Sequence, residues 1–224
     1  MSRERRVLAA LLAGAAVALL AGCGSSGGDS GTTAAKGAGA SNGIALGPAF
    51  GSMSSLAGVL TSAPPWKAND ADAQLQLRLR AIGLDPLTAE GQAVHIHQHL
   101  DIYVDGNKVT VPAQIGISAN NAFISDLHTH DATGIMHVES PTVTSFSLGQ
   151  FFAVWGVLLD QRCIGGLCAE GGKSLRAWVN GKPLNADPTR IVLAEHQEIV
   201  LAYGTPAQDP KPVPATYDFA AAGV

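Results

Sequence analysis

The alternation of side chains in residues 94–104, VHIHQHLDIYV, constrains the fold more than any other feature of this 224-residue chain. Successive side chains of a β-strand point to opposite faces, so every second residue shares a face. One face would carry Val94, Ile96, Gln98, Leu100, Ile102 and Val104, and the other His95, His97, His99, Asp101 and Tyr103. We therefore predict a strand whose apolar face packs on a core and whose histidine face meets water, a cleft or another layer.

Turn signals divide much of the remaining chain into further strands. Asp105-Gly106 predicts a tight hairpin after the first strand, and Asn180-Gly181 predicts another near the end of the chain. Residues 131–134 would connect a second pair of strands. Strands are expected in the segments 94–104, 108–113, 123–130, 135–140 and 191–204, and on both sides of the Asn180-Gly181 turn in 175–184.

One principal helix is predicted within residues 145–160. Ser147 stands three residues before Gln150, which is the spacing of a capping box, and large apolar residues then recur at helical spacing. An earlier segment, 69–86, has Asn69 or Asp70 as a possible N-cap and good helix formers after it, although its alternating leucines also fit a strand.

These elements favour an α+β fold: a mainly antiparallel sheet with one principal amphipathic helix on a face, an arrangement similar to a β-grasp. A β-sandwich with helical insertions is the alternative.

The histidine face of residues 94–104 suggests a metal site. Imidazoles at positions i and i+2 lie roughly 6.5 to 7 Å apart along a strand, close enough to converge on one ion. Three in a row span about 13 Å, too far for one ion to bind all of them easily. The pair His95/His97 or His97/His99 therefore needs further ligands from elsewhere.

The segment LHTHDATGIMHVES can supply those ligands. If residues 131–134 form a four-residue loop, His128 lies opposite His137 on one face of a strand pair, whereas a slip of one residue would divide the cluster. The predicted metal ligands are His95, His97, His99, His128, His130 and His137. Asp101, Asp131 and Glu139 are predicted as further ligands or as hydrogen-bond acceptors that orient the imidazoles. The remaining histidine, His196, is predicted to be a surface loop residue.

The donor types favour copper or zinc, with iron and nickel also compatible with imidazole. Only Met53 and Met136 remain after the predicted cleavage described below, which argues against a methionine-rich Cu(I) carrier. The alternative for the whole cluster is a solvated polar face or a pH-responsive hydrogen-bond network, because histidine titrates near neutral pH.

The N-terminus predicts export and a lipid anchor. Three arginines precede an apolar run from Val7 to Leu20, and the run ends in Leu20-Ala21-Gly22-Cys23. The run is short for a membrane span, and the tetrad resembles the bacterial lipobox, which implies cleavage before Cys23 and lipidation of that residue. Attached acyl chains would hold the mature protein at the outer side of a bacterial membrane, at the cell surface or facing the periplasm.

Composition then suggests the domain organisation. Residues 1–22 are the expected signal peptide, 23–65 a flexible Gly/Ser/Ala-rich tether and 66–204 a single globular domain. Residues 205–224 are expected to form an extended, Pro-rich tail whose Tyr217 and Phe219 are able to dock on the domain. Cys163 and Cys168 are expected to form a disulfide in the oxidising compartment, with a metal or redox role as the alternative.

Charge argues against one class of partner. Removing residues 1–22 takes away three arginines and one glutamate, so the net charge changes from −4 to −6. A mildly acidic domain without a basic stripe is a poor nucleic-acid binder, because phosphate contacts supply most of that affinity. We therefore expect no nucleic-acid partner.

Together with SLGQFFAVWG and HLDIYVDG, the string H-T-H-D-x-T-G-x-x-H-x-E-S resembles a family of uncharacterised His-rich proteins found outside the cytoplasm of bacteria and archaea. The resemblance covers roughly residues 92–204 and supports a coherent domain, but it implies no reaction.

Three functions fit these features. The first is a membrane-anchored protein that captures, buffers or delivers copper or zinc, with a metal transporter or a metalloprotein as recipient. The second is a metal-dependent enzyme, either a zinc hydrolase or hydratase or a copper oxidase, with Asp131 or Glu139 as general base. The third is a lipoprotein that binds no metal and whose interactions respond to pH.

Overall fold

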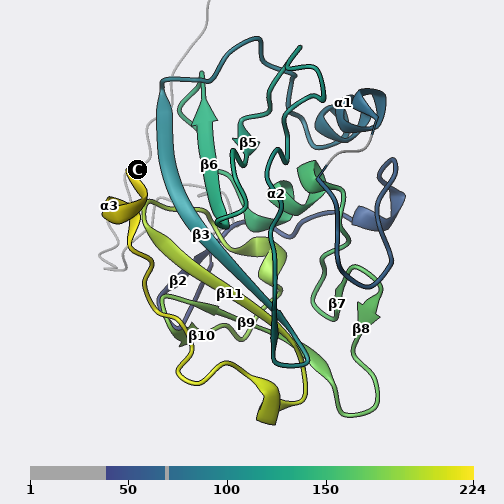
Figure 1. The fold of residues 1–224 in the computed structure, drawn as a ribbon, viewed down its shortest axis with the longest axis vertical. Coiled ribbons are helices and arrows are strands. Elements are labelled where there is room, and N and C mark those ends of the chain that lie inside the picture. Colours follow the sequence, from purple (N-terminus) through teal and green to yellow (C-terminus); the bar gives the residue numbers. More distant parts are fainter. Residues whose placement is uncertain (1–38, 69–70) are drawn as a thin grey trace, which may run out of the picture. The chain divides into compact units, whose positions relative to one another are not determined.

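The computed structural model describes residues 39–68 and 71–224 (Figure 1). Its strands are β1 (Gly39–Ser41), β2 (Ile44–Leu46), β3 (Val94–Val104), β4 (Asn107–Val109), β5 (Leu127–His128), β6 (Ile135–Ser140), β7 (Cys163–Ile164), β8 (Leu167–Cys168), β9 (Ser174–Val179), β10 (Lys182–Pro183) and β11 (Gln197–Gly204). Its α-helices are α1 (Asp72–Ala81), α2 (Leu148–Trp155) and α3 (Phe219–Ala222), and short 3₁₀ turns occupy Met53–Ser55, Pro188–Arg190 and Pro206–Gln208.

The main sheet has seven strands, in the order β10-β9-β11-β3-β6-β5, with β4 paired to β3. The pair β3–β11 is parallel, and the other strand pairs of this sheet are antiparallel. The predicted α+β class is therefore confirmed. Within the described residues, one sheet takes most of the strands, so the β-sandwich alternative does not apply.

The two faces of the sheet differ as the alternation in β3 predicts. Leu100 and Ile102 of β3 lie in the main core with Phe151, Phe152 and Trp155 of α2, and all five are buried. The opposite face carries the histidines at one end and a small apolar cluster of Trp178, Val200 and Ala202 at the other. The sheet thus has one core-packed face and one face available for a site.

Helix α2 begins as its sequence predicts. The Ser147 hydroxyl accepts a hydrogen bond from the backbone N–H of Gln150, and the Gln150 side chain accepts one from the Ser147 N–H, which completes the capping box. Gly156 ends the helix with a φ of +78°. A Cβ at that position would lie 2.9 Å from the guanidinium carbon of Arg78, so glycine serves both the backbone conformation and the close packing.

Helix α1 confirms the helical interpretation of its segment, because Leu75, Arg78 and Leu79 share its buried face. Its predicted N-cap residues, Asn69 and Asp70, lie outside the described residues.

Arg78 joins α1 to the C-terminal end of α2. It is fully buried, and its guanidinium donates hydrogen bonds to the carbonyl oxygens of Ala153, Val154 and Ala57 at 2.9 to 3.0 Å. A cation at this end of a helix also opposes the negative end of the helix dipole.

We expect Arg78→Ala to lower the free energy of unfolding by about 3 kcal/mol, because it leaves buried carbonyls without donors. Urea denaturation measures this loss. Arg80→Ala, an exposed arginine on the same helix, is the matched control and should change stability by under about 0.5 kcal/mol. Equal effects of the two variants would contradict the capping role.

Both predicted hairpin turns are confirmed. Asp105 and Gly106 have φ values of 51° and 83°, and Asn180 and Gly181 have 50° and 72°. Two successive positive φ angles are typical of the type I′ turn, whose twist matches that of paired strands.

The domain begins earlier than composition predicts. Ile44, Leu46 and Met53 lie within the predicted tether, yet they are buried in the main core. The Gly47 N–H also donates to the Arg190 carbonyl at 2.8 Å. The tether prediction is thus wrong for this part, because a few large apolar residues suffice to dock a Gly/Ser-rich segment. The predicted signal peptide, the lipidated Cys23 and the tether up to residue 38 lie outside the described residues.

The C-terminal segment 205–224 docks on the domain. Tyr217 stacks on His99 with ring centroids 3.9 Å apart, and Phe219 is buried and stacks on His196 at 4.6 Å. Figure 1 shows this yellow segment returning along the sheet to α3. Apart from two short helical turns the segment has no regular secondary structure, and the docking of its two aromatic residues is confirmed.

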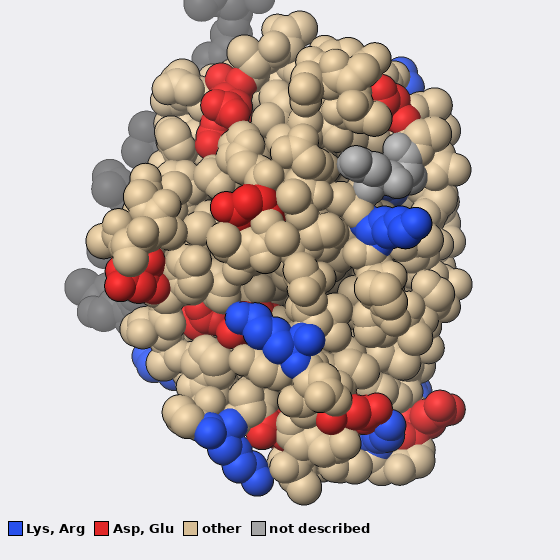
Figure 2. Space-filling model, in the orientation of Figure 1, with Lys and Arg blue, Asp and Glu red and all other residues tan. Residues whose placement is uncertain are grey.

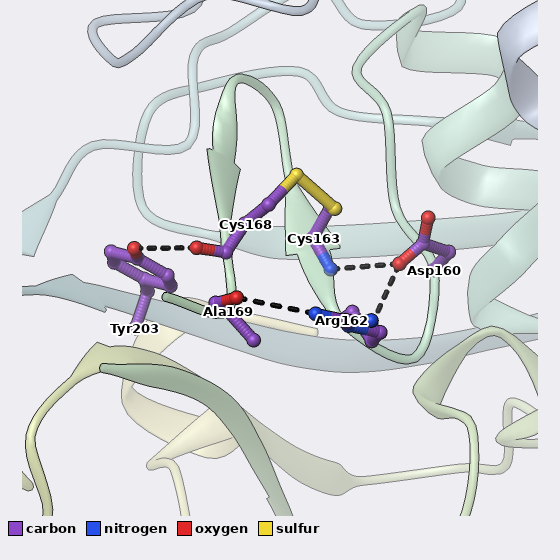
Figure 3. The surroundings of a disulfide bond; sticks show 6 residues. All are labelled: Asp160, Arg162, Cys163, Cys168, Ala169 and Tyr203. Atoms are coloured by element: carbon purple, nitrogen blue, oxygen red, sulfur yellow. Dashed lines mark hydrogen bonds between the residues drawn. A yellow bond between two sulfur atoms is a disulfide. The ribbon is translucent and has the colours of Figure 1, made fainter. Parts of the chain in front are cut away.

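Cys163 and Cys168 form the expected disulfide across the β7–β8 hairpin (Figure 3). The Asp160 carboxylate accepts hydrogen bonds from the backbone N–H groups of Arg162 and Cys163, and the Tyr203 hydroxyl donates to the Cys168 carbonyl at 2.8 Å. Because both sulfur atoms form the disulfide, neither is a free thiolate that could bind a metal.

Charged side chains of both signs are scattered over the face drawn in Figure 2, and most of that face carries neither sign. Among the described residues, we find no helix with both the length and the apolar character needed to cross a bilayer.

Candidate metal centre

Three histidines form a row across three neighbouring strands. His97 of β3 lies opposite His137 of β6, which lies opposite His128 of β5. Their ring centroids are 4.7 Å and 5.2 Å apart along the row. The predicted register of the second strand pair is therefore confirmed, and the antiparallel pairing of β3 with β6 brings the two histidine-rich segments together on one face of the sheet.

Two further histidines flank this row. His95 lies beside His97, with ring centroids 4.9 Å apart, and His130 lies 4.8 Å from His128 and 4.5 Å from His137. The side chains of His95 and His130 are 48% and 44% exposed, whereas His97, His128 and His137 are buried. The cluster thus has a buried floor, made by His97, His128 and His137, and a solvent-exposed rim, made by His95 and His130.

The buried carboxylate of Glu139 occupies the centre of the cluster. Its Oε1 lies 3.2 Å from His137 Nδ1, 3.4 Å from His95 Nε2 and 3.8 Å from His128 Nε2. The antiparallel register places Glu139 directly opposite His95, so β3 and β6 together set this arrangement.

A backbone hydrogen bond fixes the tautomer of His128. Its Nδ1 lies 2.9 Å from the carbonyl oxygen of Ser125, so Nδ1 carries the proton and donates it. The lone pair of Nε2 then points into the cluster, where Nε2 lies 3.2 Å from the Nε2 of His130. An imidazole held in this way has the orientation that metal-bound histidines commonly need.

Burial keeps the floor histidines in their neutral form. It lowers the pKa of His137 to about 3 and that of His128 to about 4, with neighbouring histidines adding to both shifts. Burial also lowers the pKa of His97, again with help from His95. Neutral imidazole is the form that binds metal, so these groups are available as ligands at neutral pH without losing a proton.

The pKa of Glu139 shifts in the opposite direction. Burial, followed by repulsion from Glu90, raises the pKa of its carboxyl to about 6. The carboxylate is therefore ionised at neutral pH, and it is held where a cation would stabilise it.

The cluster leaves buried polar atoms unused. Among the described residues, His97 Nε2 and Glu139 Oε2 are buried without a hydrogen-bond partner. Such atoms cost free energy unless a partner satisfies them. Donors bonded tetrahedrally to zinc at 2.0 to 2.1 Å lie about 3.3 Å apart, close to the 3.2 to 3.4 Å between several ligand atoms here.

Two overlapping groups of residues have ligand atoms close enough to hold an ion. One is His95, His97, His137 and Glu139, and the other is His128, His130, His137 and Glu139; within each, all ligand atoms lie within 4.8 Å of one another. These groups can therefore bind a metal ion. Comparison with protein-family models, curated proteins and solved structures found no match.

His99 belongs to a separate group with Asp101 and Glu198. Its Nδ1 lies 2.7 Å from the Glu198 carboxylate, and its Nε2 lies 3.0 Å from the Thr133 carbonyl oxygen. Both ring nitrogens already have partners, and Tyr217 covers the ring. The structure thus separates His99 from the other five predicted histidine ligands.

Two other predicted residues also lie apart from the cluster's ligand groups. Lys108 pairs with Asp101 at 2.6 Å. Asp131 accepts hydrogen bonds from the backbone N–H and the hydroxyl of Thr133, and the hydroxyl bond lowers the pKa of its carboxyl. Asp131 therefore shapes the loop between β5 and β6. His196 is an exposed loop residue, as predicted.

The sequence interpretation missed two glutamates. Glu90 lies 3.4 Å from His130 Nε2, and no pattern around it suggested this role. Glu198 is the one charged residue on its face of β11, and this isolated charge was a usable signal. Its place opposite His99 depends on the parallel pairing of β3 with β11, which joins residues far apart in the sequence.

Proposed function

We propose that this chain is a lipid-anchored extracytoplasmic protein that captures copper or zinc at the cluster of His95, His97, His128, His130, His137 and Glu139, for buffering or delivery. The observation that carries the proposal is the buried row His97–His137–His128 with the Glu139 carboxylate beside it. Within the described residues, two atoms of this group, His97 Nε2 and Glu139 Oε2, are buried without a hydrogen-bond partner. Support for the anchor comes from the sequence of residues 1–23 alone.

The exposure of His95 and His130 favours a site that captures an ion reversibly over a closed site for a structural ion. Structural zinc sites are closed by four protein ligands, whereas exchange needs a route for incoming ligands. Here His95 and His130 line such a route, because about half of each side chain is exposed. An ion on the buried floor would be within reach of solvent and of a recipient.

The donor set favours zinc or copper(II) over copper(I). The cluster offers imidazole and carboxylate, which suit these ions, whereas copper(I) prefers sulfur. Both disulfide cysteines are oxidised, and Met136 points to the core face of β6, away from its neighbour His137.

Elemental analysis tests the proposal. The full chain, freed of metal with a chelator, reloaded with zinc or copper(II) and cleared of excess, should retain metal. The double variant His137→Ala/Glu139→Gln removes both residues that the two groups share, and it should retain none. His196→Ala is the control and should match the wild type, with circular dichroism showing that each protein is folded. A wild type that retains no metal overturns the proposal.

A metal-dependent enzyme is the second candidate, and one observation favours it. A hollow of about 390 Å³ adjoins the cluster, lined by Glu90 and His130 together with Gln114, Asn121 and several apolar side chains. Such a hollow can seat a small molecule beside an ion's open coordination position. Hydrolysis of an activated ester by the zinc-loaded wild type, and not by the double variant, would favour this function.

A further inference from the structure

The cluster holds more ligands than one ion uses. Zinc normally takes four ligands, but five imidazoles and Glu139 converge here. Each of the two groups has a histidine pair of its own, His95/His97 or His128/His130, and the groups share only His137 and Glu139. A site for a single ion would need only one of these two groups of four ligands.

Glu139 is placed to join two ions. Its Oε1 lies between the pairs, 3.4 Å from His95 Nε2 on one side and 3.8 Å from His128 Nε2 on the other. Its Oε2 is buried and, within the described part of the chain, has no hydrogen-bond partner. Oε1 is hydrogen-bonded to His137 Nδ1, a residue that both groups share, so both carboxylate oxygens lie within the cluster's ligand set or beside it. A carboxylate can bind one ion with each oxygen, which suits the centre of a two-metal site, where the ions lie about 3.5 to 4 Å apart.

The site also has negative charge that would stabilise a second cation. Two divalent ions repel each other, and neutral imidazoles offset none of that repulsion. Glu139 lies between the pairs, and the Glu90 carboxylate lies 3.4 Å from His130 Nε2 at the rim. The pair His128/His130 therefore has a second carboxylate beside it.

We propose that the cluster is a two-ion centre, with one ion on His95 and His97, a second on His128 and His130, and Glu139 bridging them. This inference rests on the proposed function and specifies how many ions the site takes. Repulsion makes the second ion bind more weakly than the first. The protein would then keep one ion while the other exchanges, as delivery to a recipient requires.

Metal stoichiometry tests the inference. The full chain is dialysed to equilibrium against buffered free zinc, and bound zinc per chain is measured. We expect two ions on the wild type and on the control His196→Ala. We expect one ion on each of the double variants His95→Ala/His97→Ala and His128→Ala/His130→Ala, because each leaves one pair with the shared residues.

Electron paramagnetic resonance of the copper(II)-loaded protein provides a second readout. A purely structural role of these histidines would not change it. With two copper(II) ions bridged by one carboxylate, magnetic coupling should reduce the paramagnetic resonance signal of the wild type below that of two isolated ions. Each double variant should give the full signal of one ion. Saturation of the wild type at one zinc ion would overturn the two-ion centre and leave the proposed function intact. No bound zinc would overturn both.

Discussion

Replacing His137 with alanine is expected to weaken zinc binding by about 100-fold or more, the largest loss of any single histidine in the cluster. His137 belongs to both ligand groups, so its removal leaves neither of them complete. Loss of a residue that merely supports a ligand already costs about 10- to 100-fold in metal affinity. Competition with a chromophoric zinc chelator measures the change.

Two matched histidine variants calibrate this result. His95→Ala removes a half-exposed member of one group and leaves the other group complete, so we expect a smaller loss of affinity. His196→Ala, outside both groups, should bind zinc as the wild type does. If His137→Ala retained wild-type affinity, the row across β3, β6 and β5 would not be the binding site.

The metal-free protein is expected to lose stability as the pH falls from about 6.5 to 4. In the unfolded chain, His128 and His137 take up protons near pH 6.5, but in the folded chain they do so only near pH 4 and pH 3. The unfolded state therefore binds more protons in this range, and acid favours it. For His128 alone the effect reaches about 3 kcal/mol.

Glu139 partly opposes this trend. Its carboxyl pKa of about 6 in the folded state means that the folded chain binds the extra proton between about pH 4.5 and 6. Three histidines with lowered pKa values, His97 among them, act against two carboxyls with raised pKa values, Glu139 and the buried Glu198, so the net effect of acid remains a loss. Urea denaturation at several pH values measures it, and His137→Gln, which cannot titrate there, should reduce the slope. Stability that stays constant down to pH 4.5 would contradict the burial of these imidazoles.

Local signals predicted much of the fold. The alternation of residues 94–104 predicts β3, the Asp105-Gly106 and Asn180-Gly181 pairs predict their turns, and Ser147 with Gln150 predicts the start of α2. Each of these depends on residues within a few positions of one another, so no knowledge of the tertiary fold is needed.

Contacts between distant segments could not be predicted in this way. The docking of Ile44 and Leu46 depends on partners near Ile191, and the stacking of Tyr217 on His99 depends on the path of the C-terminal segment. Composition indicates flexibility in such segments, but a few apolar or aromatic contacts outweigh it.

The cluster itself was predictable to the extent that it depends on register. The loop length of residues 131–134 predicts His128 opposite His137, and the structure confirms this pairing. The alternation in β3 placed three histidines on one face but did not decide which of them meet β6. The register of β3 against β6 decides it, because it places His95 opposite Glu139 and His97 opposite His137, whereas His99 lies opposite Ile135 and is engaged by Glu198 of β11.

The most direct test of the account is a crystal structure of the zinc-loaded chain with data collected on both sides of the zinc absorption edge. The account predicts anomalous density within bonding distance of histidine nitrogens of the row His97–His137–His128 and of the Glu139 carboxylate. Anomalous density only elsewhere, for example at His99 or His196, or none at all in a zinc-saturated crystal, would contradict it.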